Sequence, residues 1–194
     1  MVLTYTNRKG DEYYLHQGLT KKGNARYFFS RKKDGKLAER TPQGYEIYEN
    51  PNGLVFLKKA QPKVFSDEEI AIVENGIREH TDLEFYEIDV KANTITIFLP
   101  LQDVESLREL AHLHTLKSPE QITNLIRKII TFGPEMQLVL TDKENRLFCL
   151  KRYCYRGPEA RWITLQTSSG LEPLAKKYFT HLGKDSFFDL LPGF

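Results

Sequence analysis

The dipeptide Gln61-Pro62 separates two segments whose sequence patterns are typical of different secondary structure. Before it, short runs rich in aromatic residues alternate with turn-forming residues, which is typical of antiparallel strands. Directly after it, Ser66 followed by Glu69 matches a helix capping box. We therefore expect two parts, an antiparallel β module over residues 1–62 and an α+β domain over residues 63–194.

The β module is predicted from two hairpins. Residues 12–17 and 25–30 have strand length and flank a loop with turn chemistry at both ends. Residues 45–49 and 54–58 flank Asn50-Pro51-Asn52-Gly53, a second hairpin loop.

The remaining residues read α-β-β-α-α-β-β-β-α. The clearest helical signal follows Ser118, an expected N-cap, with Pro119 at the first helical position. Its apolar stripe has the spacing i, i+3, i+4, i+7, i+8: Ile122, Leu125, Ile126, Ile129 and Ile130. We expect Gly133-Pro134 to end this helix. The predicted fold class is α+β, with an antiparallel sheet of about five strands covered by helices on one face.

The net charge of +2 averages two opposite regions. Residues 1–63 carry 13 Lys and Arg against 6 Asp and Glu, a balance of +7. Residues 64–135 carry 6 against 14, a balance of −8. The basic region therefore coincides with the β module.

Cations and aromatic rings alternate within the module. Cations hold phosphates and exposed rings stack bases, so this combination is typical of small β modules that bind single strands. We predict a non-enzymatic binding or adaptor protein whose module engages an anionic partner, with nucleic acid as the first candidate. The predicted binding residues are Lys21, Lys22, Arg26, Lys32 and Lys33, with Tyr14 and Tyr27 as stacking rings. The alternative is that the rings form the module's own core while the lysines keep its turns soluble.

Two further hypotheses remain open. In the first, the basic module docks on the acidic segment of its own chain or of a second copy, so that charge complementarity serves self-association. In the second, the protein is an enzyme with a site between the two parts, and its candidate residues are His80, Glu87, Asp89 and His114. Glu87 and Asp89 share one strand face and are expected to point to solvent, opposite an apolar face.

The sequence indicates no cofactor and no metal site. His112 and His114 are two residues apart on a predicted helix, so their rings point in different directions and cannot coordinate one metal ion. A glycine-rich phosphate loop and the common hydrolase and zinc-protease motifs are missing from the sequence. Cys149 and Cys154 are expected to be reduced thiols.

The first residues lack the apolar core of a signal peptide, and no apolar run is long enough to cross a bilayer. We therefore expect a cytoplasmic protein without membrane contact. The apolar tail over residues 187–194 is predicted to fold back into the core or, alternatively, to mediate homo-oligomerisation.

One segment resembles a stretch that recurs in uncharacterised prokaryotic proteins. The resemblance covers Tyr13-Tyr14-Leu15-His16-Gln17-Gly18, Thr20-Lys21-Lys22-Gly23, Arg26-Tyr27-Phe28-Phe29-Ser30 and residues 44–50, about the first third of the chain. It implies no activity, and it favours a bacterial cytoplasmic origin.

Overall fold

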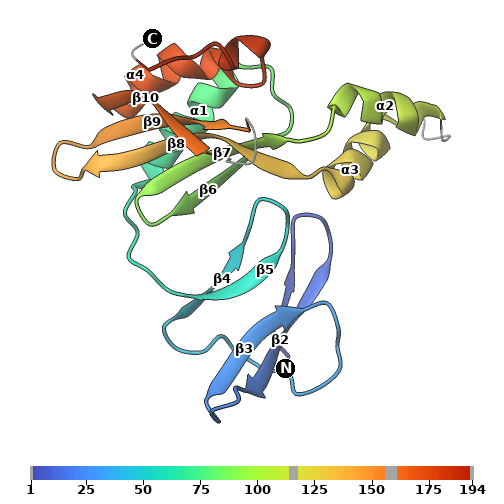
Figure 1. The fold of residues 1–194 in the computed structure, drawn as a ribbon. Helices are drawn as coiled ribbons and strands as arrows, with labels where there is room; N and C mark the ends of the chain where they lie inside the picture. The colour runs from blue at the N-terminus through green and yellow to red at the C-terminus, as the bar shows by residue number, and fades with distance from the viewer. Residues whose placement is uncertain (1, 114–117, 156–160, 193–194) are drawn as a thin grey trace. The chain divides into compact units, whose positions relative to one another are not determined.

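The computed structural model describes residues 2–113, 118–155 and 161–192. The chain forms two compact units (Figure 1). Unit 1 comprises Met1–Pro62 and Asp103–Ile130, and unit 2 comprises Lys63–Gln102 and Thr131–Phe194. The chain thus leaves unit 1 at Pro62, returns to it for two helices, and ends in unit 2.

Unit 1 begins with a three-stranded antiparallel sheet in the order β1-β2-β3 and continues with a two-stranded hairpin, β4-β5. The strands are β1 (Thr4–Thr6), β2 (Glu12–Leu19), β3 (Ala25–Ser30), β4 (Tyr45–Glu49) and β5 (Val55–Lys59). Both predicted hairpins are present, because strand-forming runs joined by turn residues specify pairing at short range.

Polar contacts connect the three-stranded sheet to the β4-β5 hairpin. The buried Asn7 side chain donates to the Gly53 carbonyl at 2.7 Å, and its oxygen accepts from the Asp11 amide at 2.7 Å. The Glu49 carboxylate accepts from the Tyr5 hydroxyl at 3.0 Å and from the Arg8 guanidinium at 2.7 Å. These bonds satisfy polar groups that lose contact with water where the two sheets meet.

The helices of unit 1 are α2 (Val104–Leu113) and α3 (Pro119–Ile129). Of the predicted stripe, Ile122, Ile126 and Ile130 are buried, whereas the other two members are exposed on the helix surface. The Lys9 ammonium donates to the Ile130 carbonyl at 2.7 Å, at the C-terminal end of α3. The helix dipole favours a cation at this end.

The prediction that Gly133-Pro134 ends α3 is wrong. The helix ends earlier, because Ile130 already has an extended backbone with ψ 146°. Gly133 and Pro134 lie inside a strand of unit 2, beside an irregularity in strand register. Proline is tolerated within a sheet at such a bulge.

Unit 2 is built on a five-stranded antiparallel sheet in the order β10-β9-β8-β7-β6. Helices α1 and α4 lie on one face of this sheet, as Figure 1 shows, and share a core with its strands. The strands are β6 (Glu87–Lys91), β7 (Thr94–Pro100), β8 (Phe132–Asp142), β9 (Leu147–Cys154) and β10 (Arg161–Ser169), and the helices are α1 (Asp67–His80) and α4 (Leu171–Tyr178). The predicted α+β class is confirmed.

The capping box at the start of α1 is present in full. The Ser66 hydroxyl accepts from the Glu69 amide, and the Glu69 carboxylate accepts from the Ser66 amide at 2.9 Å. Arg146 adds two bonds to the same carboxylate, at 2.8 and 2.6 Å. The hydrogen bond from Arg146 lowers the pKa of Glu69, so this carboxylate stays ionised at the helix N-terminus.

The C-terminal segment contributes to the core of unit 2. Two short 3-10 helices, η1 (Phe179–His181) and η2 (Asp185–Phe187), follow α4. Phe187 and Leu190 are fully buried, whereas Phe188 and Leu191 are exposed. Part of the apolar tail therefore folds back into the core. Within the described ranges, no helix has both the length and the apolar character that crossing a bilayer requires.

Candidate nucleic-acid interface

Strand register collects aromatic and basic side chains on one face of the β1-β2-β3 sheet. His16 pairs with Phe28, and Gly18 pairs with Arg26. Directly paired residues of antiparallel strands share a face, and every second residue along a strand returns to it. Tyr14, His16, Arg26 and Phe28 therefore lie together, and we call this surface the cationic–aromatic face.

The side chains of this face are stacked on one another. The His16 and Phe28 rings are 5.1 Å apart between centroids and nearly parallel, at 12°. The Arg26 guanidinium carbon lies 5.3 Å from the Phe28 centroid. Phe28 remains 39% exposed, so the face presents an accessible aromatic ring beside a cation.

The loop after β3 fixes a second cation–ring pair. The chain crosses from β3 to the other side of β2, where the Gln17 amide donates to the Lys36 carbonyl at 2.9 Å. On the way, the His16 Nε2 bonds the Lys32 carbonyl at 2.9 Å. A carbonyl oxygen only accepts, so Nε2 carries the proton. This path leaves the Lys33 ammonium 5.6 Å from the Tyr14 centroid.

Tyr14 is also anchored at its hydroxyl. The phenol donates to the Glu12 carboxylate, and this hydrogen bond raises the pKa of Tyr14. The ring is therefore held on the face as a neutral phenol.

Exposed cations surround the face at both ends of β3. Lys21 and Lys22 lie in the β2–β3 turn, and Lys32 and Lys33 lie in the loop that follows the strand. A strand of this length spans roughly 20 Å, so the two pairs of lysines bracket the aromatic rings. Within the described part of the chain, neither these lysines nor Arg26 has a carboxylate partner. Their charge is therefore available to an external anion.

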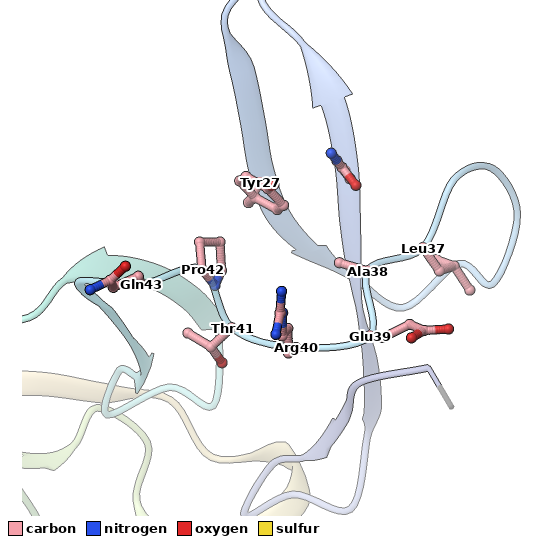
Figure 2. A pocket seen from close by; sticks show the side chains of 9 residues that line it. Tyr27, Leu37, Ala38, Glu39, Arg40, Thr41, Pro42 and Gln43 are labelled. Carbon is pink, nitrogen blue, oxygen red and sulfur yellow. The ribbon is translucent and has the colours of Figure 1, made fainter.

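Tyr27 lies on the opposite face of the sheet, because it pairs with Gln17. It lines a hollow of about 790 Å³ together with Arg40 and Pro42. Figure 2 shows the Arg40 side chain extending from the segment of residues 37–43 toward the strand that carries Tyr27. Tyr14 and Tyr27 therefore do not share one stacking surface.

The binding residues predicted from the sequence did not include Phe28, the accessible ring of the cationic–aromatic face. The signal that identifies it is the hairpin register. With Leu19 paired to Ala25, counting backward along β2 and forward along β3 places Phe28 opposite His16 and therefore on the Tyr14 face.

The described acid and histidine candidates lie on different elements of unit 2, His80 on α1 and the two acids on β6. His80 is the last residue of α1, and its side chain has no hydrogen bond or ion pair with a described residue. Glu87 and Asp89 share one face of β6, but the expectation that Asp89 points to solvent is wrong, because it is buried and pairs with Lys91 at 2.7 Å. His114 lies outside the described residues.

Over the ranges that the structure describes, no group of three or more His, Cys, Asp or Glu residues could hold a metal ion. Comparison with protein-family models, with curated proteins and with solved structures finds no match to this chain. Its function is therefore inferred from the geometry of the chain's own residues.

Proposed function

We propose that this protein is a non-enzymatic binding protein that holds single-stranded nucleic acid on the cationic–aromatic face. The observation that carries the proposal is the Arg26–Phe28–His16 stack, because it places an accessible ring directly beside a cation. A base stacks on the outer part of the Phe28 ring, and the neighbouring phosphates contact Arg26 and the lysines at the two ends of β3.

A single strand fits this face better than a duplex. An exposed ring gains stacking energy only from a base that is not already stacked between its neighbours. Gly18 lies opposite Arg26, and a Cβ atom placed on it would meet nothing within 4 Å. The surface beside the stack is therefore open enough for a flat base.

The first measurement is the affinity of the full-length chain for a fluorescently labelled oligothymidylate across a salt series. We expect affinity to fall as salt rises, with a log–log slope of about 0.7 per phosphate contacted. Replacing both Arg26 and Lys33 by Ala should reduce that slope by about 1.4. Replacing both Lys143 and Lys176 by Ala, which removes two exposed lysines of unit 2, is the control for net charge.

The second measurement separates stacking from charge. Phe28→Ala should weaken binding about tenfold at every salt concentration and leave the slope unchanged, because it removes a ring and no cation. Phe56→Ala, at an exposed ring of the β4-β5 hairpin, is the matched control. The proposal would be refuted if the protein did not bind the oligonucleotide at about 50 mM salt, or if Phe28→Ala and Phe56→Ala lowered the affinity equally.

Self-association through charge complementarity and homo-oligomerisation through residues 187–194 stay predictions. Light scattering of the full-length chain at low and high salt tests the first, because a charge-driven oligomer dissociates as salt screens the attraction. The second depends on Phe188 and Leu191, the exposed large apolar side chains of the described tail residues.

A further inference from the structure

A carboxylic acid lies in a small cavity of unit 2, at a bulge in the central strand of its sheet. Ile97 of β7 pairs with Met136 of β8, and the next residue, Phe98, pairs with Pro134. Glu135 is therefore the extra residue of β8, and bulges redirect the side chains that they carry. The cavity that Glu135 lines has a volume of about 270 Å³.

Apolar side chains form the rim of this cavity. Leu101, Tyr155 and Phe188 are all more than half exposed, although each is a large apolar or aromatic residue. Gly133 lies against two of them, since a Cβ atom there would come within 2.5 Å of Leu101 and 2.7 Å of the Tyr155 hydroxyl. Leu101 and Tyr155 are thus packed closely against the Gly133 backbone on one side of the cavity.

The Tyr155 side chain is fixed in place. Its hydroxyl donates to the Pro134 carbonyl at 3.2 Å, and its ring packs edge-on against Tyr153 with 4.6 Å between centroids. One wall of the cavity is therefore a held aromatic ring, which can pack on the apolar part of a ligand or face a cation.

Burial raises the pKa of Glu135 to about 7, and the positive charge of Arg152 opposes this shift. Arg152 itself is held by a bond from its Nε to the Leu190 carbonyl at 2.8 Å. Among the described residues, no cation is close enough to Glu135 to form an ion pair. An ionised Glu135 carboxylate would therefore gain from a cation delivered by a ligand.

We propose that the Glu135 cavity binds a small primary amine with an apolar body, whose ammonium group pairs with the carboxylate while its body packs on the rim. The carboxylate selects a cation, and the rim of Leu101, Tyr155 and Phe188 selects an apolar group. The cavity volume limits the ligand to roughly the size of a single substituted ring.

The proposal is tested with benzylamine as the probe and benzyl alcohol as its uncharged counterpart, by amide chemical-shift changes in the full-length protein. Benzylamine should shift the signals of Gly133 and Lys184 and saturate, whereas benzyl alcohol should bind at least about tenfold more weakly. Glu135→Gln keeps the shape of the side chain and should remove this difference. Phe56→Ala, in unit 1, should change nothing.

The pH dependence gives a second readout. The other titratable groups that line or face the cavity are Arg152, Tyr155, Lys184 and Asp185. Raising the pH from about 6 to about 8 should tighten benzylamine binding about tenfold, because Glu135 loses its proton over this range while the amine keeps its charge. Equal binding of amine and alcohol, or binding that Glu135→Gln leaves unchanged, would overturn the proposal.

Discussion

The two units of the chain are stabilised in different ways. Unit 2 buries a continuous apolar core between one sheet face and two helices, with Phe148 and Tyr178 among its largest fully buried side chains. The strands of unit 1 bury far less, chiefly Tyr13, Leu15 and Val55, and rely on side-chain hydrogen bonds between their loops. The β module buries few of its aromatic rings, and Phe28, Tyr45 and Phe56 remain exposed.

The largest expected effect concerns the core of unit 2. Phe148→Ala removes a ring that is 1% exposed and stacks on Phe65 at 6.2 Å between centroids. We expect the free energy of unfolding of unit 2 to fall by about 3–5 kcal/mol. Trp162, the only tryptophan of the chain, lies on β10 and reports this transition by its fluorescence in denaturant.

Phe56→Ala is the counterpart in unit 1, because it removes the same side chain from a position that is 46% exposed. It should change the Trp162 transition by less than about 0.5 kcal/mol. If both substitutions shifted this transition equally, the effect of Phe148→Ala would not be specific to the packed core of unit 2.

The next largest effect concerns the carboxyl group of Glu135. It is partly buried in unit 2 and forms no ion pair with a described residue. Burial raises the pKa of Glu135 to about 7, above its unfolded value of about 4.5. The folded protein therefore binds more protons than the unfolded chain between these two values, and this residue's contribution to stability is lost as pH rises through that window. Gln cannot ionise, so Glu135→Gln avoids this fall in stability. The variant should be more stable than wild type in unit 2 above pH 7, by at most about 3 kcal/mol.

The measurement is the difference in unfolding free energy between wild type and Glu135→Gln from about pH 4 to about pH 8. The difference should grow with pH in favour of the variant and become constant above about pH 7.5. Asp185→Asn, at the same cavity, is the control for charge removal alone. A difference that is independent of pH would show that Glu135 ionises normally in the folded protein.

Local patterns predicted the parts of this fold that depend on neighbours in sequence. The Ser66–Glu69 capping box and the hairpins around residues 18–24 and 50–53 are specified by residues only a few positions apart. The assignment of residues 103–130 to unit 1 depends on contacts far apart in sequence, such as Lys9 with Ile130. Helical periodicity identifies the buried stripe of α3, but it does not say which unit the stripe packs against.

The candidate binding site could likewise be predicted only in part, because it too depends on pairing between residues far apart in sequence. Composition identified a module rich in cations and rings, and alternation divided its rings between two faces. Only the register of β2 with β3 brings Phe28 together with Tyr14 and leaves Tyr27 on the other side. The bulge at Glu135 is likewise a property of pairing between strands, and its sequence shows only a Glu after a Gly-Pro pair.

The smallest expected effect tests whether polar contacts replace apolar packing in the β module. Asn7 is buried, and Asn7→Ala removes its bonds to the Gly53 carbonyl and to the amides of Lys9 and Asp11. The buried groups that lose their partners should lower the free energy of unfolding of the β module by about 2 kcal/mol. Hydrogen exchange of the β2 amides measures this change directly. Asn24→Ala, at an exposed turn position, is the matched control and should leave exchange unchanged. Equal exchange in both variants would mean that the few buried apolar residues hold the module together without these bonds, and the contrast between the two units would then be one of core size alone.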